Sequence, residues 1–295
     1  MNEPNEPLAF TGERFTPECV REIWYEHWHR YAFAAPLVAG RRVLDAACGE
    51  GYGSALLARQ AASVVGVDIS AEAIAHARAR YGGAPNLRFE VVDAAALEFA
   101  DRSFDVVVSF ETLEHLQAQQ ALVAGFARVL TDDGLLLISS PDKRNYSEQA
   151  GFRNEFHVRE LYREELLELL APHFPHVRLY AQKLLFQSVL WRLDGVAGPV
   201  AVATAAASGD RLAASLDYPP LYYVAACSRR PLPDELPGLA LFGDREESVY
   251  AHYNGEIRKN MTAGARIAEL EAELADARRR SAPPPAPWWR RWLGR

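Results

Sequence analysis

The sequence lacks the features that mark disulfide-bonded, zinc-binding and membrane-spanning proteins. It has three cysteines in 295 residues, and no two of them form a C-x-x-C pair. Scattered thiols of this kind give neither a disulfide framework nor a zinc site, which fits a reduced compartment. The longest small-apolar run, residues 196–207, is too short to cross a bilayer. The acidic, proline-broken N-terminus does not resemble a signal peptide, so we expect a cytoplasmic protein.

An excess of positive charge is also missing. The net charge is −7, and a general nucleic-acid binder carries the opposite sign, so we expect no nucleic-acid partner. The charge is unevenly spread, because residues 278–295 hold six arginines and no acid. Apolar residues make up 49% of the chain and charged residues 24%, which is typical of a globular protein. The length suits one large domain with appendages, or two small ones.

What the chain does contain is a regular alternation of short apolar runs and amphipathic stretches after residue 40. Strands are predicted at residues 42–46, 63–67, 87–92, 104–109, 135–139, 177–181 and 221–227. Helices are predicted between most of them, at residues 52–59, 70–82, around 122–129 and 163–170. This alternation predicts an α/β fold, with a doubly wound sheet and helices on both faces.

The segments around this sheet have different compositions. Residues 1–40 are predicted to form an arm and an aromatic-rich helix, which covers the core or acts as a lid. Residues 183–218 are too long for a plain loop, so a helical insertion is expected before the last strand. Beyond the domain at 41–230, we expect a linker over 231–261, an exposed helix over 262–280, and a proline-rich spacer with a Trp/Arg tail over 281–295. Ile267, Leu270, Leu274 and Ala277 form an apolar stripe on that helix. The stripe is too short for a stable coiled coil alone, and a homodimer stays open.

The strongest motif is VLDAACGEGYG, residues 43–53. It leads from a buried strand through Asp45 to glycines at Gly49, Gly51 and Gly53. A strand, a glycine-rich turn and a helix in this order let the backbone approach a nucleotide-like ligand. Dinucleotide binders place a further glycine where this chain has Ser54. From the residues alone, a cofactor turn and a structural turn without ligand both remain possible.

Acidic residues also end the next three strands, at Asp68, Asp93 and Glu111. Ligands of doubly wound sheets bind at the carboxyl ends of the strands. Several acids at one edge repel one another unless a ligand or ion uses them. Asp68 lies 23 residues after Asp45, where a carboxylate can accept from both hydroxyls of a ribose. The alternative for Asp68 and Asp93 is ordinary helix capping.

The second informative phrase is FETLEHL, residues 110–116. If a helix begins near Glu111, then Glu111, Glu114 and His115 share one face. Two carboxylates and an imidazole on one face suit a divalent ion. The same histidine could instead act as a base without metal, or simply form a hydrogen bond.

DAACGEGYG, VVGVDIS and SFDVVVS together resemble the class I S-adenosylmethionine (SAM)-dependent methyltransferases, over about residues 10–230. The resemblance implies a seven-stranded sheet with an antiparallel last strand, and SAM as cofactor. It also implies which residues bind the cofactor: Asp45, Gly49, Gly51, Gly53, Asp68, Ile69, Asp93, Ala94 and Phe110. A preceding helix often acts as a lid in this family, which adds Arg14, Arg30 and Tyr31 as candidates.

The spacing E-x-x-E-H at residues 111–115 is similar to that in ubiquinone-pathway O-methyltransferases and in enzymes that methylate the terminal 2′-hydroxyl of small RNAs. In the RNA branch a second histidine completes a metal site, and His157 lies where that residue would. The resemblance therefore implies Glu111, Glu114, His115 and His157 as ligands of Mn²⁺ or Mg²⁺, with His115 and His157 as catalytic residues. The further signature of the RNA branch and a basic face are both absent, so the RNA substrate is not carried over.

The phrases GERFTPE, CGEGYGS, FETLEHL and NEFHVREL resemble methyltransferases of bacterial cell-surface polysaccharide and glycan assembly. This resemblance implies O-methylation of a saccharide or glycan-linked hydroxyl. A quinone-like or natural-product O-methyltransferase and a SAM-binding interaction module without catalysis remain alternatives. The last residues, WWRRWLGR, suit an anionic membrane interface or a protein partner, so the location is predicted as cytoplasmic with a peripheral membrane contact open.

Overall fold

The computed structural model describes residues 16, 22–195, 199–205, 212–234 and 236–281. The chain divides into two units, residues 1–242 and residues 243–295, which are described separately. Among the described residues, no helix combines the length and the apolar character needed to cross a membrane.

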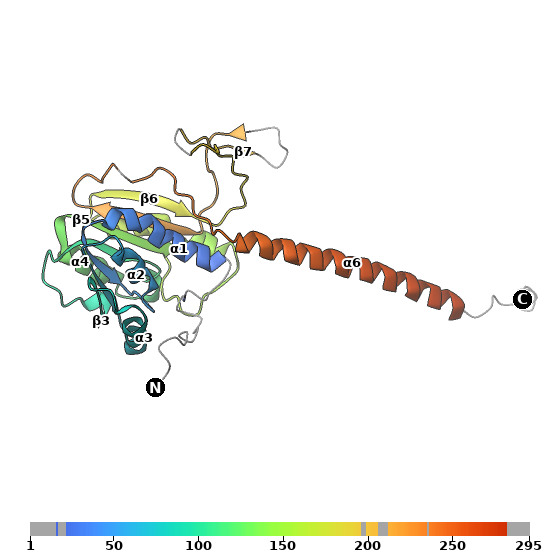
Figure 1. Cartoon of the computed structure of the whole chain (residues 1–295), viewed down its shortest axis with the longest axis horizontal. Coiled ribbons are helices and arrows are strands. Elements are labelled where there is room, and N and C mark those ends of the chain that lie inside the picture. The colour runs from blue at the N-terminus through green and yellow to red at the C-terminus, as the bar shows by residue number, and fades with distance from the viewer. Residues whose placement is uncertain (1–15, 17–21, 196–198, 206–211, 235, 282–295) are drawn as a thin grey trace, which may run out of the picture. The chain divides into compact units, whose positions relative to one another are not determined.

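A seven-stranded sheet forms the centre of the first unit (Figure 1). Its strands are β1 (Arg42–Ala46), β2 (Ser63–Asp68), β3 (Leu87–Val91), β4 (Phe104–Ser109), β5 (Leu130–Pro141), β6 (His176–Gln182) and β9 (Tyr222–Ser228). The spatial order is β3-β2-β1-β4-β5-β9-β6. Strand β9 pairs antiparallel with β5 and β6, and the other pairs are parallel. This order confirms the predicted sheet, and its strand order reverses between β1 and β4, where ligands of such sheets bind.

Helices cover both faces of the sheet. On one face, α1 (Glu22–Ala34), α2 (Tyr52–Ala58) and α3 (Ala71–Tyr81) share a buried cluster with alternate strand residues. On the other face, α4 (Gln119–Val129) and α5 (Arg163–Leu170) share a second cluster. The inner strands are therefore buried on both sides, which explains their continuous apolar sequences.

The segment between β6 and β9 differs from the expectation. Its described residues contain two short antiparallel strands, β7 (Thr204–Ala205) and β8 (Leu212–Ala213), and no helix. The predicted helical insertion is therefore wrong for the described part of residues 183–218. Gly195 and Pro199 interrupt the segment, and side chains such as Leu190 stay exposed. A short helix that packs against nothing is marginal in water.

The second unit contains one long helix, α6 (Ser248–Ser281). It begins well before the expected start at residue 262, so the linker is shorter than predicted. Its side chains are mostly exposed, and it carries ion pairs such as Lys259 with Glu256 and Arg266 with Glu269. Such pairs support an exposed helix, whose apolar side chains Ile267, Leu270 and Leu274 are also exposed. The Trp/Arg tail lies outside the described residues.

Candidate active site

The glycine-rich turn after β1 is shaped by packing as well as by ligand access. Gly51 has φ +94°, and a Cβ there would lie 2.8 Å from the Ala77 Cβ. At Gly53 a Cβ would lie 2.1 Å from Cζ of Tyr31, because α1 crosses the turn at this point. Two of the three glycines are thus required by the close approach of α1 and α3. Gly49 lines a cavity instead.

Asp45 is completely buried at the end of β1. The Tyr31 hydroxyl donates to its Oδ1 at 3.1 Å, and the Ser54 hydroxyl donates to its Oδ2 at 2.6 Å. Burial raises the pKa of Asp45 to about 6. The cavity described next is not lined by Asp45, Gly51 or Gly53. These residues stabilise the turn through their packing and hydrogen bonds.

A cavity of about 540 Å³ opens at the carboxyl edge of the sheet. This volume is within the range of small-molecule sites, about 300–1,000 Å³. From the predicted cofactor set it is lined by Gly49, Asp68, Ile69, Asp93, Ala94 and Phe110. From the predicted metal set it is lined by Glu111, Glu114, His115 and His157. One cavity therefore joins residues that follow β2 and β3 with residues that follow β4, across the switch point of the sheet.

Asp68 is held in a fixed orientation at the end of β2. Its Oδ2 accepts from the Gly49 backbone N–H and its Oδ1 from the Ser70 N–H, both at 2.9 Å. A carboxylate oxygen has a second acceptor position, so both oxygens can still bind hydroxyls. Asp93 accepts from the Ala95 N–H at 2.8 Å and caps a short 3-10 helix. Asp93 thus combines the capping role with a place on the cavity wall.

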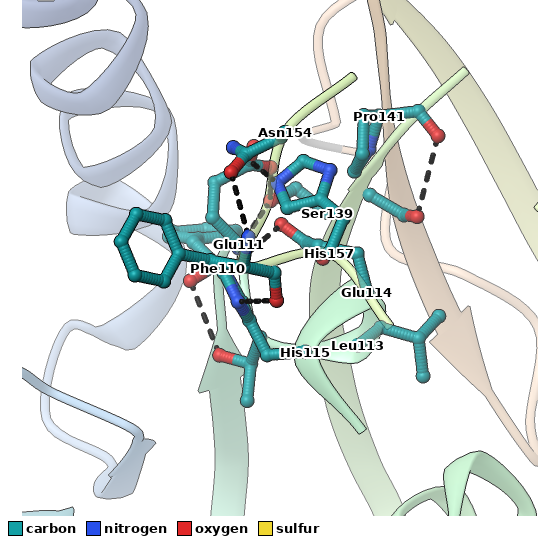
Figure 2. A network of polar contacts seen from close by, with 12 residues as sticks. Phe110, Glu111, Leu113, Glu114, His115, Ser139, Pro141, Asn154 and His157 are labelled. Carbon is teal, nitrogen blue, oxygen red and sulfur yellow. Dashed lines mark hydrogen bonds and ion pairs between the residues drawn. The ribbon is translucent and has the colours of Figure 1, made fainter. Parts of the chain in front are cut away.

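The chain after β4 does not continue into the predicted helix. Glu111 has φ +50°, a left-handed conformation, and only a short 3-10 helix, η3 (Leu113–His115), follows. The Glu111 N–H donates to the Ser139 hydroxyl at 2.9 Å, and that hydroxyl donates to Glu111 Oε1 at 2.7 Å (Figure 2). Arg30 Nη2 lies 3.5 Å from the same carboxylate oxygen. The prediction that Glu111 shares a helix face with Glu114 and His115 is wrong, since its side chain turns towards β5 and α1.

Glu114, His115 and His157 come together beside the cavity (Figure 2). Each offers a ligating atom, and these atoms lie within 4.8 Å of one another. The Glu114 backbone carbonyl accepts from the N–H groups of Val158 and Arg159, at 2.8 and 3.0 Å. These bonds attach η3 to the segment that carries His157, more than forty residues later in the sequence.

Hydrogen bonds set the orientation of both imidazoles. His115 Nδ1 lies 3.0 Å from the Phe156 carbonyl, which can only accept, so Nδ1 carries the proton. His157 Nδ1 lies 2.6 Å from Glu160 Oε1. Asn154 Oδ1 accepts from the Phe156 N–H, which turns the Asn154 amide nitrogen towards His157 Nε2 at 3.0 Å. With Nδ1 protonated in both rings, Nε2 is the acceptor nitrogen of each: His157 Nε2 accepts from the Asn154 amide, and His115 Nε2 lies 3.9 Å from Glu114 Oε1.

The Glu114 carboxyl is buried, and within the described part of the chain neither oxygen has a hydrogen-bond partner. Burial, with a contribution from Glu111, raises its pKa well above the usual value. A buried carboxylate without a partner is costly. The charged form of Glu114 therefore needs a nearby positive charge, and the described groups that can supply one are Arg30 and the His115 ring, whose Nε2 lies 3.9 Å from Glu114 Oε1.

Arg30 and Tyr31 of the expected lid take different places. Tyr31 lines the cavity, whereas Arg30 is buried against Glu111 and donates from Nε to Gln182 Oε1 at 2.8 Å. The Arg30 guanidinium also lies 4.5 Å from the centre of the Tyr222 ring. Arg14 is outside the described residues.

Sequence reasoning missed Tyr146, Asn154, Glu160 and Tyr222. Tyr146 stacks on His157, with ring centres 5.3 Å apart. It lies in a short π-helix (Arg144–Glu148), and Asn154 lies in an irregular stretch. The phrase NEFHVREL contains Asn154, His157 and Glu160, but the pattern assigned no contact to Asn154 or Glu160, and the segment of Tyr146 has no periodicity or motif.

The chain resembles known methyltransferases in sequence and in fold. Residues 44–138 match a family model described as "Methyltransferase domain". A Mycobacterium tuberculosis protein named as a probable SAM-dependent methyltransferase is 41% identical over 166 residues, covering 55% of this chain and 60% of the relative. The chain thus spans less than two thirds of that relative. YcgJ of Bacillus subtilis has a similar structure, with a TM-score of 0.50 at 19% identity, covering 69% of this chain and 100% of YcgJ.

Shorter matches differ in the acceptors that their names describe. A ubiquinone biosynthesis O-methyltransferase of Paracidovorax citrulli is 36% identical over 109 residues, covering 36% of this chain and 45% of the relative. Phosphoethanolamine N-methyltransferase 1 of Triticum aestivum is 37% identical over 105 residues, covering 35% of this chain and 21% of the relative. The methyltransferase-domain match thus covers residues 44–138, and the strand order with the antiparallel β9 is the one that the resemblance in sequence implied.

Proposed function

We propose that this chain transfers the methyl group of SAM to a hydroxyl of an acceptor held beside His115 and His157. The observation that supports this most is that Asp68, His115 and His157 all line the same large cavity. Neighbouring strands lie about 4.8 Å apart, so the ends of β2 and β4 are separated by roughly 10 Å. That separation leaves room for the cofactor's ribose at one end and the reacting groups at the other.

The donor side suits a cationic cofactor. The two oxygens of Asp68 would accept from the ribose hydroxyls, and the Gly49 turn allows the backbone to come close. Among the described residues that line the cavity are four acids and no lysine or arginine, which favours the positive charge of a sulfonium. SAM is already an electrophile, so the protein must mainly align donor and acceptor and exclude water.

The acceptor side suits a hydroxyl. The acceptor oxygen attacks the methyl carbon, the carbon–sulfur bond breaks, and S-adenosylhomocysteine leaves. The hydroxyl proton passes to Nε2 of His115, or to Nε2 of His157 when the acceptor displaces the Asn154 amide from it. Glu160, 2.6 Å from His157 Nδ1, would hold that ring in place and stabilise the imidazolium that forms.

Glu114, His115 and His157 also fit a divalent ion such as Mn²⁺ or Mg²⁺. Their donor atoms are close, and the Glu114 oxygens have no hydrogen-bond partner in the described structure. When bound, such an ion lowers the pKa of a coordinated hydroxyl. Glu111 would support this group from outside, through Ser139 and Arg30, rather than complete it.

For the acceptor we propose a saccharide or glycan-linked molecule. Sugar hydroxyls would hydrogen-bond to the acids of the cavity, while the rings of Tyr146 and Tyr222 would cover apolar faces. A quinone-like acceptor is the rival, because it would use the same histidines and the same aromatic rings. A SAM-binding module without catalysis is a third alternative.

A transfer assay with methyl-labelled SAM separates these alternatives. It would be run with sugars, lipid-linked sugars and quinols as acceptors, with and without EDTA. We expect an O-methylated product, loss of turnover with EDTA, and recovery with Mn²⁺, while SAM binding persists. Full activity in excess EDTA, with no metal in the purified protein, would exclude the metal and leave the histidines as bases. SAM binding without transfer to any acceptor would support the interaction module instead.

A further inference from the structure

A second cavity, of about 190 Å³, lies beside α1 in the first unit. Its walls come from three segments distant in sequence: residues 183–187 after β6, residues 216–220 before β9, and residues 239–242. The side chains that these segments contribute are mostly apolar and include Leu184, Leu185, Leu216, Pro219, Pro220 and Leu239. The catalytic residues discussed above do not line it.

A single layer of side chains separates this smaller cavity from the large one. Tyr222 lines the large cavity, whereas Glu26 and Gln182 line the smaller one. Gln182 and Tyr222 are register partners in β6 and β9, and the Tyr222 side chain hydrogen-bonds with Glu26. The two cavities are therefore neighbours that share a wall, and a ligand that occupies both has to pass this wall beside Gln182 and Tyr222.

The buried polar groups of the smaller cavity are already satisfied within the protein. Gln182 accepts from Arg30 Nε at 2.8 Å and donates to the Glu26 carbonyl at 2.9 Å. The Glu26 carboxyl is paired with Tyr222 and lies beside Arg30. The lining also includes His29, Lys183 and Gln187, so the surface that these pairs leave to a ligand is mainly, and not wholly, apolar. An apolar ligand gains from such a surface, whereas a polar ligand would lose its hydration without new partners.

Exposed apolar side chains continue from the cavity along the same segment. Phe186, directly after the lining residue Leu185, is 70% exposed, and Leu190, five residues after Leu185, is fully exposed. Exposed apolar side chains gain from contact with another apolar surface. A chain longer than the cavity would find further apolar contacts here.

We propose that the smaller cavity binds the hydrocarbon chain, acyl or isoprenoid, of the methyl acceptor, whose hydroxyl-bearing head group occupies the large cavity. The inference rests on the proposed function for the identity of the head group. It makes the acceptor an amphiphile and not a free sugar. A lipid-linked saccharide and a prenylated quinol both have this chemistry.

Calorimetry on the full chain tests the proposal with dodecyl maltoside below its critical micelle concentration, and with maltose as the chain-free control. We expect the amphiphile to bind and maltose to bind at least tenfold more weakly. Leu185→Asn and Leu239→Asn should weaken amphiphile binding at least tenfold, because each places a polar amide in the cavity wall. Leu274→Asn, on the exposed helix α6, is the matched control and should change it less than twofold.

Three results would overturn the proposal: no binding of the amphiphile, equal affinity for maltose, or equal effects of all three substitutions. Binding only to phosphatidylcholine vesicles, lost in Leu190→Asn, would assign the segment to membrane docking instead. If one of the asparagine variants does not fold, Leu216→Trp is used in its place. Its indole should fill the smaller cavity and block binding of the amphiphile. SAM titrations run in parallel check each fold and report on the proposed function independently, because SAM binds in the other cavity.

Discussion

At the residue scale, buried carboxyl groups are the most unusual feature of the domain. Glu26, Asp45 and Glu114 are all buried, and burial raises the pKa of each above its usual value. Their surroundings differ. Asp45 accepts two side-chain hydroxyl donors, and Glu26 lies beside Tyr222 and Arg30. Glu114 has no hydrogen-bond partner among the described residues, which makes it the group most in need of a proton or a cation.

Glu26 should make the stability of the domain depend on pH. Its pKa is raised from 4.5 to about 7, mainly by burial, so the folded state holds this proton more tightly than the unfolded state. The free energy of unfolding should therefore fall as pH rises from about 4.5 to 7, and then level off. Glu26→Gln keeps the shape without the charge. It should raise stability at pH 8 by on the order of 1–3 kcal/mol and leave it nearly unchanged at pH 4.

Urea unfolding at a series of pH values measures this effect. Glu98→Gln is the matched control, because Glu98 is exposed and the same charge is removed. If wild type and Glu26→Gln show the same dependence of stability on pH, then Glu26 is ionised in the folded state without cost, and this account of its surroundings is wrong.

At the element scale, the packing of α1 on the glycine turn holds the cofactor side together. Gly53→Ala should destabilise the domain by about 1–3 kcal/mol, because its Cβ would overlap the Tyr31 ring. In a Tyr31→Ala background the ring is absent, so Gly53→Ala should lower the stability of the domain only slightly. The difference between the two backgrounds is the coupling energy, which a double-mutant cycle with thermal unfolding measures.

Gly125→Ala on α4 is the control for this cycle. It is also a helical glycine, but the nearest atom to an added Cβ is Leu97 Cδ1 at 3.9 Å. Alanine should be neutral or slightly stabilising there. Equal effects of Gly53→Ala and Gly125→Ala would show that α1 does not rest on the turn as the structure has it.

The elements also show what the sequence can and cannot predict. β1, β2 and β4 are recognisable because strands buried on both faces must be apolar throughout. The left-handed Glu111 after β4 is not recognisable, since local propensity favours a helix there and the contacts with Ser139 and Arg30 decide otherwise. The early start of α6 was missed for a related reason. Its first turns contain Tyr, Asn and Gly, which have low helix propensity.

The site residues were predictable only where they belong to a recognisable sequence motif. Asp68 and the histidines lie in or next to recognisable phrases, and the structure places them on one cavity. Glu160 and Asn154 orient His157 through contacts that depend on an irregular segment. No periodic pattern encodes such contacts, so only the folded chain shows them.

At the scale of the whole molecule, the division into two units predicts that the C-terminal region is separable from the chemistry. Deleting residues 281–295 should leave turnover of a water-soluble acceptor unchanged, because the large cavity is lined by residues of the first unit alone. The deletion should weaken binding to anionic vesicles, and wild-type binding should fall with added salt as arginine attraction is screened.

Vesicle co-sedimentation at low and high ionic strength decides this prediction. Replacing Arg290, Arg291 and Arg295 by alanine is a milder variant that removes charge and keeps the tryptophans. No wild-type binding at low ionic strength would exclude a membrane role for the tail. Loss of turnover on truncation would show that the tail contributes to the active site.

The central claim is that the large cavity binds SAM through Asp68, next to the histidine pair. Calorimetric titration of SAM tests this most directly, with wild type, Asp68→Ala, His115→Ala and the exposed control Asp101→Ala. Loss of hydrogen bonds to a charged acceptor should cost Asp68→Ala about 1.5–3 kcal/mol, which is a fall in affinity of roughly 10- to 150-fold. Asp101→Ala and His115→Ala should bind SAM as wild type does. Unchanged binding in Asp68→Ala, or no SAM binding by wild type, would contradict the account.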